Sequence, residues 1–154
     1  MPEGTRPFRV LVTGSRSWTD EGVIHDALSG LHFKHGSPIT LVHGACPRGA
    51  DAIADYWAEL RNSGEFTPVI VERHPADWDA PCGPVCRTSH RRRRDDGSSY
   101  CPMAGLVRNQ RMVDLGADVA LAFIVDNSRG TADLIRRAEK AGIPVRRYER
   151  TTSG

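Results

Sequence analysis

Three short segments carry the glycine, hydroxyl and guanidinium groups that proteins use to hold an anion. We call them the first, second and third glycine loops; they span residues 14–16, 44–51 and 128–131. Glycine lets a backbone approach a ligand closely, and the N–H groups that start a helix attract negative charge. Arg16 and Arg129 can add bidentate hydrogen bonds to a phosphate or a carboxylate. The candidate ligand-binding residues in these loops are Gly14, Ser15, Arg16, Gly44, Gly49, Ser128, Arg129, Gly130 and Thr131.

Three further polar residues lie in or beside the second glycine loop. His43 precedes it and is a candidate proton donor or ligand contact, although a lone histidine in such a turn is more often a satisfied structural group. Asp51 is expected at the start of a helix, where it either complements the helix dipole or takes a ribose hydroxyl. Cys46 has no base beside it in sequence, which favours a small loop residue over a reactive thiol.

Apolar, β-branched runs precede each glycine loop, and a helical pattern follows each one. Such alternation predicts a parallel α/β sheet with right-handed connections. We predict one Rossmann-like domain over residues 1–154, with about five strands and helices on both faces. The expected strands are residues 8–13, 39–42, 68–72, 118–124 and 144–148, and the expected helices are residues 21–31, 52–60, 105–115 and 131–140.

The order of these elements places the three glycine loops at one edge of the sheet. Ligands of such sheets bind outside the carboxyl ends of the strands, near the point where the strand order reverses. The chain contains neither G-x-G-x-x-G nor G-x-x-x-x-G-K-[ST]. We therefore predict no NAD or FAD and no ordinary P-loop nucleotide site.

Length and composition describe a compact globular protein. The chain has 154 residues and a formal net charge of +2, which provides no bulk argument for nucleic acid or a membrane. No apolar run approaches the roughly 20 residues of a membrane helix. Residues 1–9 lack the apolar core of a secretory signal, so we expect a cytoplasmic, reducing location.

Residues 77–104 show neither strand nor helix periodicity and are rich in Cys, Pro, Arg and Ser. A loop of this length in a compact domain needs something to hold it. Cys82, Cys86, His90 and Cys101 are ligands of the types that a tetrahedral structural zinc takes. We predict a zinc-binding insertion at residues 78–104, with free thiols or a disulfide as the alternatives.

The same insertion carries four adjacent arginines, residues 91–94. Such a run is usually a solvated face, but it can also contact a polyanion or a ligand phosphate. Asp95 and Asp96 offset part of this charge, so nucleic acid is possible but not favoured. If the insertion folds over the sheet edge as a lid, Trp78 or Tyr100 could stack on a base.

The chain resembles the SLOG superfamily, which unites DprA-like and LOG-like Rossmannoid proteins, and within it the YspA- and YpsA-related branch. The matching segments are residues 10–16, 43–51, 108–112 and 128–131. Each is weak alone, but their order and spacing together are specific. The resemblance implies binding of nucleotides or nucleotide derivatives, with Arg108 and Asn109 among the ligand contacts, and assembly into homo-oligomers.

LOG enzymes of this superfamily hydrolyse the N-glycosidic bond of nucleoside monophosphates. Their signature is an Arg-Lys pair followed by P-G-G-x-G-T-x-x-E. Here Arg108 matches the arginine and residues 130–131 match the Gly-Thr, but Asn109 replaces the lysine and Leu134 the glutamate. Asp133 is turned about 100° from that position, so it could be catalytic only on a rotated helix.

The sequence thus favours a protein that binds a small phosphorylated, nucleotide-like ligand, as a sensor or sequestering module. A nucleotide-processing enzyme, most plainly a nucleoside monophosphate N-glycosidase, is the alternative. Single-stranded nucleic-acid binding through the arginines, by analogy with DprA, is a weaker one.

Overall fold

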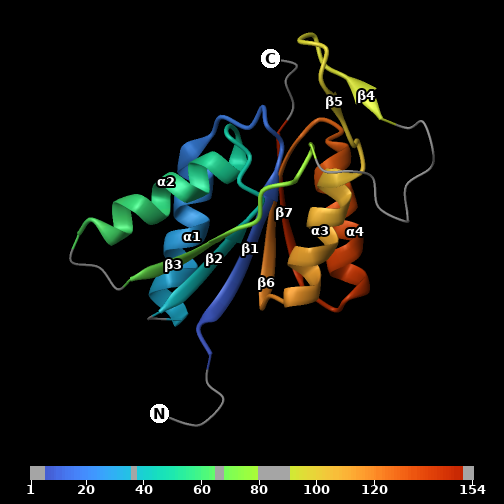
Figure 1. The fold of residues 1–154 in the computed structure, drawn as a ribbon. Helices are drawn as coiled ribbons and strands as arrows, with labels where there is room; N and C mark the ends of the chain where they lie inside the picture. The colour runs from blue at the N-terminus through green and yellow to red at the C-terminus, as the bar shows by residue number, and fades with distance from the viewer. Residues whose placement is uncertain (1–5, 36–37, 65–67, 80–90, 151–154) are drawn as a thin grey trace.

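The protein is built on a five-stranded parallel sheet. The computed structural model describes residues 6–35, 38–64, 68–79 and 91–150. The strand order is β3-β2-β1-β6-β7, and each neighbouring pair is parallel (Figure 1). The predicted Rossmann-like α/β fold is therefore confirmed. The strands are β1 (Phe8–Gly14), β2 (Ile39–His43), β3 (Val69–Arg73), β6 (Val119–Val125) and β7 (Val145–Arg150).

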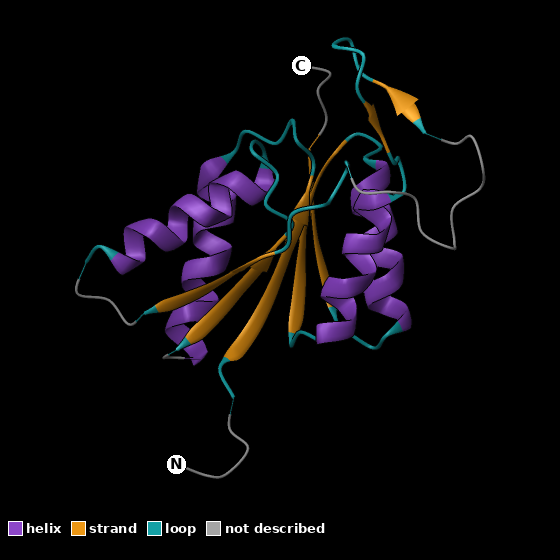
Figure 2. Ribbon diagram, viewed as in Figure 1, coloured by secondary structure: helices purple, strands orange, loops and turns teal. Residues whose placement is uncertain are grey.

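Two helices cover each face of the sheet (Figure 2). Helices α1 (Glu21–His35) and α2 (Ala50–Asn62) lie on one face, and α3 (Ala104–Leu115) and α4 (Arg129–Lys140) on the other. Side chains alternate along β1, so Val10 and Val12 join the core under α1 and α2 whereas Leu11 joins the core under α3 and α4.

Position in the sheet explains the strand sequences. All residues of β2 are buried, and β6 is almost entirely buried, because helices cover both faces of these inner strands. β7 lies at the edge and is highly charged, as isolated edge strands often are. Its Val145 packs on the α3–α4 side, and its Tyr148 stacks on Phe123 with 4.8 Å between ring centroids on the opposite side.

The chain reverses direction across the sheet between β1 and β6. It first runs outward from β1 to β2 and β3, and then returns through α3 to β6 and β7 on the other side. The carboxyl ends of β1, β2 and β6 meet at the upper edge in Figure 1. The three glycine loops follow these three strands, so they share one edge as predicted.

The structure also adds details that the sequence pattern did not indicate. Helix α1 continues to His35 rather than ending at residue 31, and α2 begins at Ala50. The arginine-rich segment contains a small antiparallel hairpin of β4 (Arg92–Arg93) and β5 (Ser99–Tyr100). Strands of two residues are too short to produce a periodic pattern.

The predicted zinc insertion falls largely outside the described residues. This applies to Cys82, Cys86 and His90, whereas Cys101 is described and buried. Within the described ranges, no group of three or more His, Cys, Asp or Glu side chains is arranged to hold a metal ion. None of the described helices is both long enough and apolar enough to cross a membrane.

Candidate anion-binding site

The first two glycine loops are packed directly against each other. Gly49 has a φ of 80°, and a Cβ atom there would collide with the Ser15 carbonyl oxygen and the Arg16 backbone. Just after it, the N–H of Ala50 donates to the Ser15 oxygen at 3.3 Å. A Cβ on Gly14 would likewise strike Ala50 and the carbonyl of Phe123. These two glycines therefore permit the close approach of backbones from β1, α2 and β6.

The buried hydroxyl of Ser15 joins β1 to β6 across the reversal point. It donates to the Val125 carbonyl oxygen at 3.2 Å and accepts the Val125 N–H at 2.9 Å. The Ser15 N–H donates to the Phe123 carbonyl at 2.9 Å. Ser15 thus fixes the position of the first glycine loop, and its hydroxyl group is already hydrogen-bonded within the protein.

Arg108 extends from the first turns of α3 over the second glycine loop. Its Nη1 donates to the carbonyl oxygens of Gly44, at 2.6 Å, and His74, at 3.2 Å, while its Nε donates to Asn109 at 3.0 Å. Any side chain at Gly44 would overlap the guanidinium. Burial lowers the pKa of Arg108; Asp51 opposes this shift, and the positive charge of nearby Arg16 adds to it.

Asp51 lies beneath the second glycine loop rather than on its surface. It is 7% exposed, and its Oδ2 accepts the Cys46 N–H at 3.3 Å. Burial raises the pKa of this carboxyl, while His43 and Arg108 counteract part of the effect. The side chain therefore helps shape the loop, a function that neither reading from the sequence included.

His43 has both ring nitrogens occupied. Its Nδ1 accepts the Ala45 N–H at 2.9 Å, so the proton of the neutral ring lies on Nε2, which contacts Asp55 at 2.7 Å. Asp55 also accepts two hydrogen bonds from Arg73, at 2.7 and 3.1 Å, and these are the first cause of its lowered pKa. This arrangement agrees with the structural interpretation of His43.

Neither Asp55 nor Arg73 belongs to a recognisable sequence motif. Arg73 lies beside this cluster because the parallel pairing of β2 with β3 places it opposite His43. Asp55 is one helical turn after Asp51 on α2, and that spacing was the available signal.

The third glycine loop forms the N-terminus of α4. The Ser128 hydroxyl bonds to the Thr131 hydroxyl at 2.9 Å and makes no cap hydrogen bond to the helix backbone. Arg129 and Gly130 are exposed at this end. The first-turn N–H groups therefore have no side-chain cap and are suited to an anion.

Asn109 and Asp133 connect α3 to α4 behind this loop. The Asn109 amide donates to the Gly130 carbonyl at 3.2 Å and to Asp133 at 3.1 Å. Asp133 is 4% exposed and also accepts from Arg136 at 2.6 Å and Arg137 at 2.8 Å. Both carboxylate oxygens are thus engaged by neighbouring side chains.

Two residues other than glycine adopt left-handed backbone conformations at this edge. Ala45 has a φ of 58° in the second glycine loop, and Asp126 a φ of 54° just before the third. Such conformations are unfavourable for residues with a Cβ and concentrate at functional sites. Their presence after two of the strands that end at this edge supports a binding role for it.

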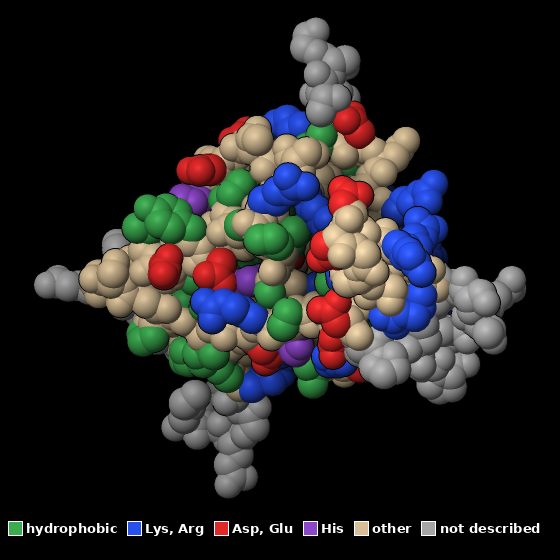
Figure 3. Space-filling model, turned by 45° about the horizontal axis from the view of Figure 1, so that its top comes forward, with side chains coloured by type: hydrophobic (Ala, Val, Ile, Leu, Met, Phe, Trp, Pro, Cys, Tyr) green, Lys and Arg blue, Asp and Glu red, His purple; other side chains and the backbone are tan. Residues whose placement is uncertain are grey.

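The aromatic side chains proposed as stacking groups contact each other. Trp78 and Tyr100 meet edge to face with 6.0 Å between centroids. Arg94 lies over the Tyr100 ring at 5.0 Å and pairs with Asp79 at 2.9 Å. Viewed onto the sheet edge, basic side chains gather at its middle and on the side of the β4–β5 hairpin (Figure 3).

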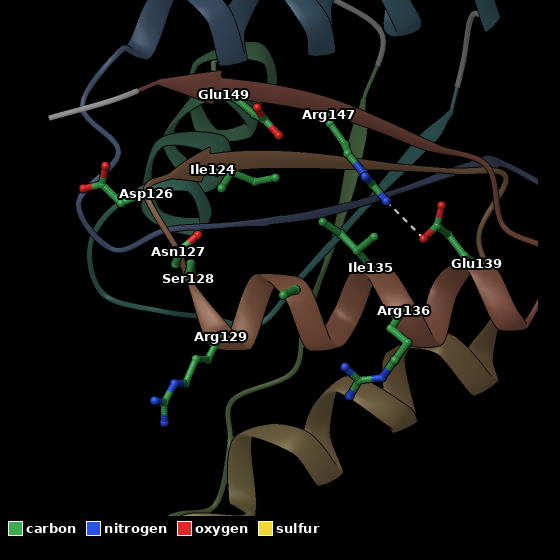
Figure 4. A pocket seen from close by; sticks show the side chains of 11 residues that line it. Ile124, Asp126, Asn127, Ser128, Arg129, Ile135, Arg136, Glu139, Arg147 and Glu149 are labelled. Carbon is green, nitrogen blue, oxygen red and sulfur yellow. Dashed lines mark hydrogen bonds and ion pairs between the residues drawn. The ribbon is translucent and has the colours of Figure 1, made fainter. Parts of the chain in front are cut away.

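A groove of about 620 Å³ opens beside the third glycine loop, between α4 and β7 (Figure 4). A smaller hollow of about 280 Å³ lies outside His43 and is lined in part by Cys46 and Tyr56. The edge thus combines guanidinium groups, uncapped helix amides and an adjoining groove, an arrangement that suits a ligand with an anionic end.

The chain is similar to a known protein family and to a phage protein. A family model described as "YspA, cpYpsA-related SLOG family" matches residues 8–80, which include the first two glycine loops. The Gene 61 protein of Mycobacterium phage D29 is 42% identical over 137 residues, which is 89% of this chain and 93% of that protein. No solved structure matches the chain. The chain therefore belongs to the YspA and cpYpsA-related SLOG family.

Proposed function

We propose that the protein binds a nucleotide or nucleotide derivative, with the phosphate at the carboxyl edge of the sheet. The observation that carries this proposal is the juxtaposition of Arg16 and Arg108. The Arg16 backbone packs against Gly49 and the Arg108 guanidinium packs against Gly44, so the two arginines contact opposite ends of the second glycine loop. Two arginines brought to one edge of the sheet favour an anion there.

The surroundings of Arg108 strengthen this proposal. Its Nη1 and Nε positions are used by the protein, but its Nη2 has no hydrogen-bond partner among the described residues. Among the described residues, Asp51 is the one carboxylate whose charge acts on Arg108, whereas Arg16 adds a second positive charge, so this part of the edge keeps an excess of positive charge. A ligand phosphate would balance that charge and accept from the free side of the guanidinium.

The third glycine loop provides a second set of donors. Its uncapped N–H groups at the start of α4 favour negative charge through both hydrogen bonding and the helix dipole. Membership of the SLOG family supports a nucleotide as the source of the phosphate.

Binding without N-glycosidic cleavage fits the carboxylates near this edge. Such cleavage requires a carboxylate beside the sugar to stabilise an oxocarbenium-like transition state. Asp133 is engaged by Asn109, Arg136 and Arg137, and Leu134 is fully buried. We therefore propose a sensor or sequestering protein rather than a hydrolase.

Titration calorimetry with a panel of nucleoside monophosphates and inorganic phosphate tests the proposal. We expect binding by the unmodified chain and affinity at least about tenfold weaker in Arg16→Gln, because a charged hydrogen bond is lost. Arg111→Gln is the matched control, since Arg111 is an exposed arginine on α3, and its affinity should be unchanged.

The same mixtures should be analysed by chromatography for free base. No release is expected. Failure of every nucleotide and of phosphate to bind would overturn the proposal, and release of base would establish the hydrolase instead.

A further inference from the structure

The groove between α4 and β7 differs chemically from the arginine-lined edge that it adjoins. Its apolar side is formed by Ile124 of β6 together with Ala132 and Ile135 of α4. Ile124 and Ile135 point into the space between strands and helix in Figure 4. At about 620 Å³ the groove is in the size range of sites for small organic ligands.

The charged residues of the groove do not all face its interior. Figure 4 shows Arg129 and Arg136 directed away from it, whereas Arg147 and Glu149 extend into it from β7. Arg147 pairs with Glu139 across the groove at 3.1 Å. The cation that faces the interior is thus already neutralised.

Glu149 differs from Arg147 in having no ion-pair partner among the described residues. Its carboxylate makes no hydrogen bond or ion pair with any residue that the structure describes, and it lies over Ile124 in Figure 4. The groove lining contains three arginines and three carboxylates, so it carries no net formal charge that would attract a phosphate. Its apolar side and the unpaired Glu149 carboxylate favour a ligand group that is apolar on its faces and donates hydrogen bonds from its edge.

The position of the groove relates it to the anion-binding edge. Asn127 and Ser128 line its near end, where the third glycine loop starts α4. Asn109 accepts from Arg108 and donates to the Gly130 carbonyl, so the start of α4 lies beside the Arg108 guanidinium. A ligand whose phosphate is bound there can therefore extend its other end between α4 and β7.

We propose that this groove is the base subsite of the nucleotide-binding site and that it selects guanine through Glu149. The inference rests on the proposed function. A guanine presents two adjacent N–H donors, the ring N1–H and the exocyclic amino group, which one carboxylate accepts together. Adenine presents a ring nitrogen lone pair beside its amino group, and that lone pair repels a carboxylate. Ile124 and Ile135 contact the faces of the ring.

Calorimetry with GMP, AMP and ribose 5-phosphate tests the inference. The unmodified chain should bind GMP at least about tenfold more tightly than AMP, because a polar site rejects an analogue that leaves its groups unpaired. Glu149→Gln should reduce this preference to about threefold or less and leave the affinity for ribose 5-phosphate unchanged. Glu21→Gln, at the exposed start of α1, removes the same charge elsewhere and should behave like the unmodified chain.

A second variant tests the location without changing charge. Ala132 is exposed on α4 and lines the groove, so Ala132→Phe should fill it while the helix is retained. GMP affinity should then fall to that of ribose 5-phosphate, with thermal denaturation verifying the fold.

The outcomes separate the two proposals. Equal affinities for GMP and AMP, a preference for AMP, or a guanine preference that survives both Glu149→Gln and Ala132→Phe would overturn the base subsite while the proposed function stands. Failure of all three ligands to bind would overturn the proposed function itself.

Discussion

The Ser15 hydroxyl and the His43 imidazole each have their hydrogen-bonding positions occupied by the protein. Ser15 is bonded to Val125, and His43 to Ala45 and Asp55. Both residues lie beside a glycine loop, and their types alone suggested ligand contacts. Val125, the partner of Ser15, is 110 residues away, and Asp55, a partner of His43, lies in another element, so the sequence could not show that these groups are satisfied.

Other site residues could be identified from the sequence because the structure requires their residue type at that position. Gly14 and Gly49 must lack a Cβ because adjacent backbones pack on them, and Arg108 was reached through a motif. Glu149 was not identified. Its relevance depends on strand β7 facing α4 across a groove, and no short motif encodes that arrangement.

Glu72 provides a pH-dependent contribution to stability. Its carboxylate accepts from Arg9 at 2.8 and 3.1 Å and contacts His74 at 2.9 Å. Arg9 is the first cause of a pKa lowered from 4.5 to about 2, with His74 adding to it. A carboxyl whose pKa is depressed on folding stabilises the protein above its unfolded pKa and loses this contribution as pH falls.

We therefore expect Glu72→Gln to be less stable than the unmodified chain at pH 6 and the difference to shrink between about pH 4.5 and 2. Urea denaturation across this range measures it. The effect should remain modest, since the side chain is 34% exposed and solvent screens the pair. Glu139→Gln breaks a pair whose two side chains are about half exposed and should change stability little at any pH. A constant difference for Glu72→Gln would contradict the expectation.

The β4–β5 hairpin is held to residues 78–79, and the chain runs from it directly into α3. Arg94 lies over Tyr100 and pairs with Asp79, and the Cys101 N–H donates to the Trp78 carbonyl at 2.9 Å. Helix α3 begins at Ala104, and Arg108 follows one turn later. Whatever holds Cys101 therefore also helps to position Arg108.

We expect that holder to be a structural zinc with Cys82, Cys86, His90 and Cys101 as ligands. Elemental analysis of the purified chain should find about one zinc per molecule. Cys101→Ser should lose most of the metal and weaken phosphate binding through displacement of α3. Cys46→Ser, which alters a cysteine in the second glycine loop, should retain the zinc. A purified, unmodified chain without zinc would refute the assignment.

At the scale of the whole molecule, alternation of buried strands and amphipathic helices was enough to predict the fold. Strands such as β2 and β6 are continuously apolar because both faces are covered, and this pattern is visible in sequence. The end of α1 could not be predicted, because its last residues, including the 93% exposed Phe33, follow no burial pattern. The meeting of the three glycine loops at one edge was predicted from topology, since parallel strands bring their carboxyl ends together.

The loops after β1 and β2 pack together at a single residue, Gly49. It and Gly142 have nearly identical left-handed conformations, with φ of 80° and 83°. A Cβ at Gly142 meets nothing within 4 Å, whereas one at Gly49 strikes Ser15 and Arg16. Alanine at either position incurs the conformational cost of about 1 kcal/mol, but alanine at Gly49 must also separate two backbones.

Gly49→Ala should therefore lose roughly 2–4 kcal/mol of unfolding free energy in urea denaturation, against about 1 kcal/mol for Gly142→Ala. It should also weaken phosphate binding, because Arg16 moves away from Arg108 when the first glycine loop is displaced. Gly142→Ala lies at the opposite end of α4 and should bind phosphate normally. Equal losses of stability in the two variants would mean that the first glycine loop moves aside at no measurable cost. The positions of Arg16 and Arg108 would then depend on contacts other than the packing of Gly49.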